Sequence, residues 1–366
     1  MTIVTTVLTM CGVSGLLAFL LSLANKTIAN YGDKEISINE GTKTLTVDGG
    51  DTLLSALVEQ KVFIPSACGG KGSCGYCKVQ VLSGGGQILP TELGYITKDE
   101  QADHYRLACQ LKVKDNLSIQ IPEELFSVQQ MTYVVEDLIE ETPTIKHLKL
   151  KLPEGEALNF KAGQYVQILA PKYEGNEEEV YRAYSIASSP MDFNHLELYI
   201  GLVKGGIATT FVHNFLKPNQ KLTVVGPYGH FFYQDTDAPM VLVAIGTGMA
   251  PIMSILKYMR DMKIMRKAIF FFGARTRDDL FEIDALNALK TDLPNLTIMP
   301  CLSRPTEQCH WDGEVGRVTD LLHKYLTEAE KSEAYLCGSP VMIDAVIPIL
   351  KEKGMPEDKI YYDKFE

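Results

Sequence analysis

The spacing of apolar and polar positions divides the chain into four stretches. Residues 3–23 carry no charged side chain, and residues 35–121 alternate short apolar strands with turns around one short helix at 52–60. Residues 133–233 hold many short strands separated by turn residues, which is typical of a small antiparallel barrel. From residue 239 a unit of strand, glycine turn and helix recurs, which predicts a doubly wound parallel sheet. We therefore expect a multi-domain chain with segments at 1–25, 32–125, 131–233 and 238–366.

The uncharged N-terminal stretch predicts a single transmembrane helix. About 21 residues at ~1.5 Å each give roughly 31 Å, enough to cross the apolar core of a bilayer. A cleaved signal peptide normally has a basic region before its apolar run, whereas the first lysine here is Lys26, after the run. A buried core helix of this length would normally show a polar face. Lys26 and Lys34 place the body of the protein on the cytoplasmic side of a bacterial-type inner membrane.

Charge and cysteine content narrow the function. The formal net charge of −11 opposes binding to a nucleic-acid backbone, so we expect no nucleic-acid partner. The chain has eight cysteines but is too long to depend on a disulfide framework. Closely spaced cysteines in such a chain indicate metal ligation or redox chemistry.

Half of the cysteines lie in one stretch: Cys68, Cys74, Cys77 and Cys109. Three close cysteines on a glycine-rich loop, with a fourth after 31 intervening residues, match the four thiolates that a 2Fe–2S cluster needs. The glycines between them let the backbone wrap tightly and direct N–H groups at the sulfur atoms. Structural zinc is the alternative, but zinc sites usually use two C-x2–4-C pairs and this stretch has one. Free thiols are the other alternative.

A second motif lies at a strand end in the expected barrel: Arg182, Ala183, Tyr184 and Ser185. A guanidinium can bind a pyrophosphate bidentately, a tyrosine can stack on a flavin ring, and a hydroxyl can bond to its edge. A salt-bridged arginine beside a packed tyrosine is the alternative. A glycine turn with the expected helix 210–216 behind it offers a further phosphate site. That turn comprises Gly205, Gly206, Ile207, Ala208 and Thr209.

A third motif follows the apolar strand at 241–245 and opens a helix: Gly246, Thr247, Gly248, Met249, Ala250 and Pro251. Glycines allow a phosphate to approach the backbone, and proline suits the first helical turn. Two further strand ends carry candidate contacts: Cys337 with Gly338, and Gly273 with Ala274 and Arg275. A small buried core residue is the alternative interpretation of Cys337.

Three runs carry a family resemblance: C-G-G-K-G-S-C-G-Y-C, S-G-G-G-Q-I-L-P-T-E-L and R-L-A-C-Q. They resemble the ferredoxin domain of the F subunit of the Na⁺-translocating NADH:quinone oxidoreductases. The resemblance implies a β-grasp (α+β) domain whose four cysteines bind a 2Fe–2S cluster. The later motifs look like the FAD-binding and nucleotide-binding halves of the ferredoxin–NADP reductase superfamily.

The same resemblance implies roles for single residues. Arg182 and Thr209 would contact phosphate groups of FAD, and Tyr184 and Ser185 would lie at its isoalloxazine ring. Cys337 would lie beside the nicotinamide and Phe365 would cover the flavin, so we name Cys337, Ser185, Tyr184 and Phe365 as candidate catalytic residues. The strand position Ile200 joins the cofactor-binding set.

The resemblance implies the electron path NADH to FAD to 2Fe–2S to a membrane redox partner, in a quinone reductase that transports sodium. NADH is favoured over NADPH by the G-A-R-T and W-D-G-E-V-G runs, although Arg275, Arg277 and Arg304 could each meet a 2′-phosphate. The alternative function is the reductase component of an oxygenase, which uses the same three modules. A membrane-tethered ferredoxin with an inert C-terminal half is opposed by Arg182 and Cys337. The residues leave the final acceptor, ion coupling and partner subunits open.

Overall fold

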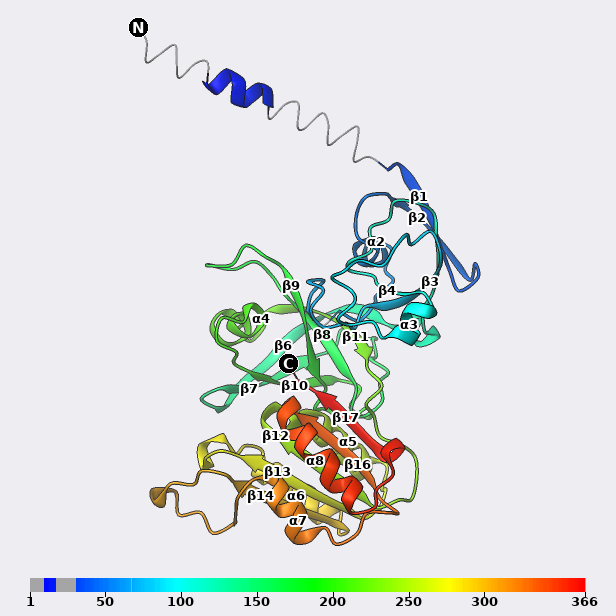
Figure 1. Cartoon of the computed structure of the whole chain (residues 1–366). Coiled ribbons are helices and arrows are strands. Elements are labelled where there is room, and N and C mark those ends of the chain that lie inside the picture. Colours follow the sequence, from blue (N-terminus) through cyan, green and yellow to red (C-terminus); the bar gives the residue numbers. More distant parts are fainter. Residues whose placement is uncertain (1–9, 18–30, 67, 366) are drawn as a thin grey trace. The chain divides into compact units, whose positions relative to one another are not determined.

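The computed structural model describes residues 10–17, 31–66 and 68–365. The chain forms two compact units that divide between Val128 and Gln129 (Figure 1). The first unit carries the cysteine loop. The second carries the barrel and the parallel sheet.

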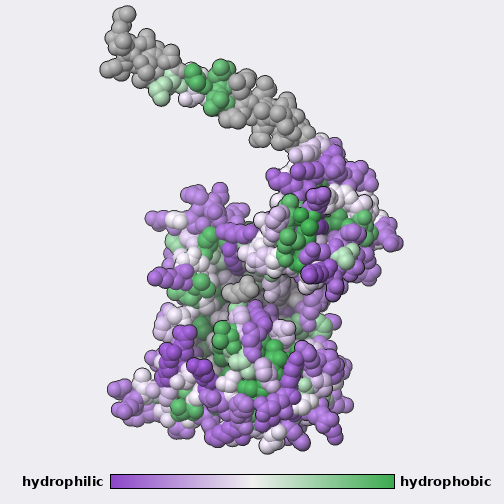
Figure 2. Space-filling view, in the orientation of Figure 1, coloured by the Kyte–Doolittle hydropathy of each residue, from purple (hydrophilic) through white to green (hydrophobic). Residues whose placement is uncertain are grey.

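Most of the predicted transmembrane segment lies outside the described residues. Residues 10–17 are helical, and the apolar side chains of Met10, Val13, Leu16 and Leu17 are exposed there (Figure 2). Among the described residues, no helix has both the length and the apolar character needed to cross a membrane. The single-pass anchor therefore stays a prediction.

A mixed five-stranded sheet builds the first unit. Its elements are β1 (Asp33–Ile38), β2 (Lys43–Asp48), α2 (Leu53–Glu59), β3 (Lys78–Ser83), α3 (Lys98–Ala102), β4 (Tyr105–Leu107), β5 (Leu117–Gln120) and the 3₁₀ turn η1 (Glu123–Ser127). The strand order is β2-β1-β5-β3-β4, with β1 and β5 parallel and the other pairs antiparallel. Thr52 caps α2 by accepting a hydrogen bond from Ser55 N, and α2 buries Leu53, Ala56 and Leu57. The helix α2 packed on a mixed sheet is the β-grasp arrangement.

Strand β4 is short, with three residues. β4 ends at Leu107, and residues 108–110 form a turn. Cys109 therefore lies in a turn directly after the strand, where its side chain is not held to the alternating directions of a β-strand.

An antiparallel six-stranded sheet opens the second unit. Its elements are β6 (Gln129–Thr142), β7 (Ile145–Lys151), β8 (Tyr165–Ala170), β9 (Val180–Ser185), β10 (His195–Gly201), α4 (Ile207–Thr210), the π-turn η2 (Phe211–Phe215) and β11 (Lys221–Tyr228). The order is β10-β7-β6-β11-β8-β9, and a bridge between Ile186 and Leu198 joins the two edge strands into a barrel. The helix expected at 210–216 begins three residues earlier, at Ile207, because Gly206 already serves as its N-cap.

Six parallel strands complete the second unit: β12 (Met240–Ile245), β13 (Ala268–Ala274), β14 (Leu296–Leu302), β15 (Glu314–Val315), β16 (Glu333–Gly338) and β17 (Ile360–Lys364). The longer helices between them are α5 (Met249–Asp261), α6 (Ile283–Asp292), α7 (Val318–Tyr325) and α8 (Pro340–Glu352), and 3₁₀ turns lie at η3 (Gly246–Gly248), η4 (Arg277–Asp279), η5 (Glu307–Cys309) and η6 (Glu357–Lys359). Alternate residues of β12 face opposite cores. Leu242 packs in the core that includes residues of α5 and α6, and Val243 packs in the one that includes residues of α7 and α8. Burial on both faces explains the continuous apolar run of this strand.

The strand order β15-β14-β13-β12-β16-β17 defines a switch point. From β12 the chain winds outward through β13, β14 and β15, and then crosses to β16 on the other side of β12. The connections leaving β12 and β16 therefore diverge at the carboxyl ends of these two strands, which is where open α/β sheets bind ligands.

Candidate functional site

The four cysteines of the first unit lie together. Cys77 Sγ and Cys109 Sγ are 3.2 Å apart, and both residues are buried. Cys68 and Cys74 form a second hydrogen-bonded pair, and the charge of Cys74 acts on Cys77. All four are free thiols. The structure thus brings one candidate ligand from the turn after β4 to the three that lie on the loop.

Backbone N–H groups surround these sulfur atoms. Lys71 and Ser73 supply backbone hydrogen bonds to Cys68, and Gly72 supplies one to Cys109. The loop needs glycine where it bends. Gly72 has a φ of +73°, and a Cβ there would lie 2.6 Å from Gln110 Nε2. Hydrogen bonds of this kind stabilise cluster sulfurs and tune their potential.

The thiols differ in acidity because each pair shares a hydrogen bond. The hydrogen bond from Cys77 is the main cause that lowers the pKa of Cys109 to about 6. Burial acts to raise the pKa of Cys68, but hydrogen bonds from Ser73 and Cys74 outweigh it and bring the pKa to about 7. The same interaction with Cys109, together with burial, raises the pKa of Cys77. Each pair therefore holds one sulfur that readily becomes the thiolate that metals bind. Four thiols with N–H donors around them fit a 2Fe–2S cluster.

A buried ion pair supports this site, and the sequence reasoning missed it. Arg106 Nη2 lies 2.7 Å from Glu92 Oε2, and both side chains are almost fully shielded from solvent. Glu92 Oε1 also accepts a hydrogen bond from Leu107 N at 2.8 Å. The ion pair therefore joins the segment around Glu92 to strand β4, which ends just before Cys109. The sequence did hold a signal for this pair, because Glu92 and Arg106 both lie inside the runs that carry the family resemblance.

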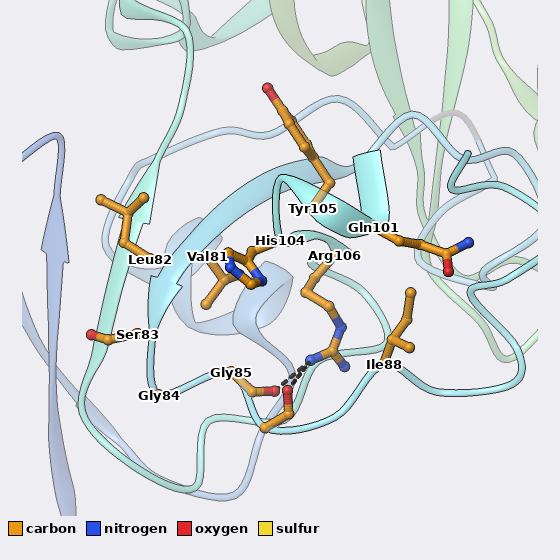
Figure 3. Close-up of a pocket in the computed structure, with 11 residues that line it drawn as sticks. Val81, Leu82, Ser83, Gly84, Gly85, Ile88, Gln101, His104, Tyr105 and Arg106 are labelled. Atoms are coloured by element: carbon orange, nitrogen blue, oxygen red, sulfur yellow. Dashed lines mark hydrogen bonds between the residues drawn. The ribbon is translucent and has the colours of Figure 1, made fainter. Parts of the chain in front are cut away.

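A hollow of about 390 Å³ lies beside this ion pair, between β3, the glycine turn after it and β4 (Figure 3). Arg106 reaches into its wall, where Nη1 donates to Gly85 O and to Gly86 O. With Glu92 bound to its other nitrogens, this guanidinium is occupied within the fold. No residue of the predicted cofactor sites lines the hollow.

The predicted flavin motif forms the second half of β9. Within the described part of the chain Arg182 forms no ion pair, and its Nη1 donates to the neighbouring Tyr181 O at 2.7 Å. The structure therefore does not support the alternative in which Arg182 is held by a salt bridge. Ser185 is buried at the strand end, and burial raises the pKa of Tyr184.

The glycine turn before α4 is held by Thr209. Its hydroxyl accepts from Val203 N at 3.2 Å, and a Cβ on Gly206 would lie 2.7 Å from Thr209 Oγ1. Gly205 has a φ of +76° and open space around it. The hydroxyl that we expected on a phosphate thus closes the turn. Ala208 and Ile200 are buried, and Ile207 is partly buried.

The two ends predicted for the nicotinamide site meet at the switch point. A Cβ on Gly248 would lie 2.2 Å from Cys337 O, so only glycine fits there. Gly338 has a φ of +139°, and a Cβ on it would come within 2.8 Å of Ile245 Cγ1. Thr247 Cγ2 lies 3.2 Å from the Cβ position of Gly201, which brings the barrel strand β10 to the same turn. Met249, Ala250 and Pro251 are buried in the first turn of α5.

Asp363 is a residue that the sequence reasoning missed. It pairs with Cys337 across β16 and β17, and burial raises its carboxyl pKa to about 6. Cys337 itself is fully buried, and burial, followed by the charge of Asp363, raises the pKa of its thiol. Phe365 N donates to Gly338 O at 2.9 Å, so the tail continues along β16. Only the pairing of β17 reveals this neighbour of Cys337.

The adenosine-side candidates lie at the end of β13. A Cβ on Gly273 would lie 2.7 Å from Val318 Cγ1. Ala274 O accepts from Ser303 N at 3.0 Å, and Arg275 O accepts from Arg304 N at 2.8 Å. Two of the three arginines considered for a 2′-phosphate are thus neighbours in the fold. The third, Arg277, lies over the Trp311 ring at 5.8 Å.

Three domain families match successive parts of the chain. A 2Fe-2S iron-sulfur cluster binding domain matches residues 36–114, an oxidoreductase FAD-binding domain matches 133–233, and an oxidoreductase NAD-binding domain matches 242–347. The predicted cofactors, 2Fe–2S, FAD and NADH, are thereby confirmed.

Solved structures of similar shape include an Amycolatopsis cytochrome P450 reductase, with a TM-score of 0.74 and 26% identity over 91% of this chain and 98% of that one. A ferredoxin reductase of carbazole 1,9a-dioxygenase has a TM-score of 0.69 at 24% identity, over the same shares of both chains. The latter likeness shows the fold.

Curated relatives are more similar in sequence. The F subunit of the Na(+)-translocating NADH-quinone reductase of Neisseria meningitidis is 37% identical over 95% of this chain and 96% of its own length. The corresponding F subunit of Actinobacillus succinogenes is 37% identical over 95% of both chains. The chain belongs to the family of F subunits of the Na(+)-translocating NADH-quinone reductase.

Proposed function

We propose that this protein oxidises NADH and passes the electrons through FAD and a 2Fe–2S cluster to a membrane-bound redox partner in a quinone reductase complex. One observation carries the proposal: a chain of this family holds cluster, FAD and NAD domains in succession. The enzyme is an NADH-dependent oxidoreductase.

Different residues serve the cluster and the flavin. FAD supplies hydride acceptance and the cluster supplies one-electron transfer. The three cysteines of the loop and Cys109 hold iron. Arg182 neutralises the FAD pyrophosphate, and Tyr184 and Ser185 bound the isoalloxazine.

At the switch point, the turn Gly246–Gly248 exposes backbone to the nicotinamide dinucleotide. Cys337 and Gly338 shape the wall beside the nicotinamide, and Arg275 serves the adenosine side. Phe365, at the end of the tail, is proposed to cover the flavin ring.

The proposal extends to segments and location. We assign 1–25 to a membrane anchor, 32–125 to the cluster domain, 131–233 to the FAD domain and 238–366 to the NAD domain. The anchor would hold the body of the protein on the cytoplasmic side of an inner membrane. Its support is the uncharged run at 3–23 and the family's place in a quinone reductase.

The reductase component of an oxygenase is a second candidate. It is favoured by the likeness to the Amycolatopsis cytochrome P450 reductase, 98% of which matches this chain at 26% identity. The two functions differ in the acceptor: a membrane redox subunit in the first, a soluble oxygenase in the second.

The substitution Cys77→Ser tests the path. We expect the purified variant to lose the EPR signal of the reduced cluster while keeping its FAD, because the flavin motif lies in the other compact unit. NADH should still bleach the flavin, and reduction of quinone through the membrane partner should fall. Cys309→Ser, at a cysteine outside the loop, is the control and should retain both. An unchanged cluster signal in Cys77→Ser would refute the ligand assignment, and no flavin bleaching in the wild type would refute the function.

A further inference from the structure

A group of charged side chains lies where the barrel meets the nucleotide-binding sheet, and none of them belongs to the predicted cofactor sites. Glu141 is on β6, His147 is on β7, and Glu282 directly precedes α6. One ring nitrogen of His147 and one oxygen of each carboxylate all lie within 4.8 Å of one another. The three side chains are largely shielded, with 12–19% of each exposed.

The distances between these atoms suit metal ligands better than hydrogen bonds. His147 Nδ1 lies 3.3 Å from Glu282 Oε1 and 3.5 Å from Glu141 Oε1. Charge-assisted hydrogen bonds are shorter, about 2.7–2.9 Å. Ligand atoms held ~2.0–2.1 Å from a tetrahedral zinc ion are separated by roughly 3.3–3.4 Å. The observed spacing therefore matches two edges of a zinc coordination tetrahedron.

The other ring nitrogen of His147 has an orientation that zinc sites use. Nε2 is buried and has no hydrogen-bond partner among the described residues. The group it faces is Glu197 Oε2, 3.7 Å away. A histidine that binds metal through one nitrogen commonly directs the other to a carboxylate, which fixes the ring and its tautomer. The Tyr199 ring, 4.9 Å away, meets the imidazole at a steep angle and restricts its rotation.

The charge of the group is unbalanced in favour of a cation. Lys257 forms an ion pair with Glu197, which leaves the carboxylates of Glu141 and Glu282 without a lysine or arginine among the described residues. Tyr199 Oη donates to Glu282 Oε1 at 2.8 Å and holds that carboxylate in place. Two partly buried carboxylates and an imidazole are a donor set for Zn²⁺.

We propose that Glu141, His147 and Glu282 bind a divalent transition-metal ion of the zinc class, which ties the FAD-binding barrel to the start of α6 in the nucleotide-binding domain. Glu197 orients the imidazole and Tyr199 orients Glu282. Because its ligands come from both domains, the ion restricts their relative motion.

Equilibrium dialysis of the full-length holoprotein against Zn²⁺ at pH 7.5 tests the site, with zinc and iron both counted by mass spectrometry. We expect the wild type to hold about one zinc ion per chain more than His147→Gln, with equal iron contents showing that the cluster cysteines are still occupied. Zinc should also raise the melting temperature of the wild type and leave that of His147→Gln unchanged.

His195→Gln is the matched control. His195 also lies between two carboxylates, 3.2 Å from Asp192 Oδ2 and 3.4 Å from Glu136 Oε1, but it is more exposed. This variant should bind zinc as the wild type does. If His147→Gln does not fold with bound FAD, Glu282→Gln replaces it in the test. The amide oxygen of this glutamine can still accept the hydrogen bond from Tyr199. The affinity for zinc should nevertheless fall at least about 10-fold. The proposal would be overturned if the wild type and His147→Gln, or Glu282→Gln in its place, took up equal amounts of zinc. Loss of zinc uptake in His195→Gln would also overturn it.

Discussion

Single residues pack closely where β12 and β16 end, at the edge of the sheet where we propose that the nicotinamide binds. The backbone of Gly248 lies against Cys337 O so closely that a single Cβ would not fit. The Cys337 side chain is fully buried at this edge. Packing here is tight enough that losing one sulfur atom should shift the bound ring.

We therefore expect Cys337→Ala to slow flavin reduction by NADH on the order of 10-fold while leaving FAD content unchanged. Stopped-flow absorbance of the flavin measures this rate. Cys301→Ala is the control, since Cys301 is also fully buried, on β14. A wild-type rate in Cys337→Ala would remove Cys337 from the hydride-transfer site.

Asp363 predicts a pH dependence of stability. Burial raises its pKa to about 6 in the folded protein, against roughly 3.9 in an unfolded chain. The folded state therefore binds this proton more tightly, and stability is lost as the pH rises from about 4 to about 6. Asp363→Asn removes the buried charge, so it should stabilise the protein by about 3 kcal/mol at pH 7.5 and by about half as much at pH 5.

Differential melting of the variant and the wild type at the two pH values checks this expectation. The gain in melting temperature should be a few degrees at pH 7.5. An equal gain at both pH values would show that the carboxyl does not titrate in this range.

At the scale of elements, the cluster site depends on contacts that hold the loop to β4. Glu92 accepts from Arg106 and from Leu107 N, and Gly75 packs against Tyr95 from the same connecting segment. Breaking a buried ion pair on one side leaves a buried charge without its partner, which costs about 3–5 kcal/mol. Surface ion pairs contribute far less, about 0–1 kcal/mol.

Glu92→Gln should therefore lower the stability of the first unit by about 3–5 kcal/mol and make the cluster easier to lose. Glu100→Gln is the matched control, because its partner Lys78 is partly exposed and the cost should stay below about 1 kcal/mol. Urea unfolding followed by the visible absorbance of the cluster measures both. Similar midpoints for the two variants would show that the buried pair does not support the site.

At the scale of the whole molecule, every predicted cofactor residue lies after residue 31. Removing residues 1–25 should therefore leave a soluble protein that still oxidises NADH with ferricyanide. Transfer to the membrane partner should fall, because the anchor raises the effective concentration of the cluster at the membrane. The comparison is made in membranes at equal low protein concentration. Equal rates for the truncated and full-length chains would favour the oxygenase-reductase function.

The sequence by itself determined the order of the modules and their cofactors. Period-two strands before residue 233 and strand–turn–helix units after it predict a barrel and a parallel sheet, because burial on one face or on two leaves different apolar patterns. The cysteine spacing and the glycine turns could be interpreted from the sequence, because metal ligation and backbone geometry depend on residue type at short range.

Only the tertiary structure decided which distant residues meet. The pairing of β17 with β16 places Asp363 beside Cys337, and the pair Glu92 with Arg106 joins two runs that the sequence shows as separate. The group of Glu141, His147 and Glu282 comes from three elements of two domains. No local pattern encodes these contacts, because each depends on strand order and packing between segments far apart in the chain.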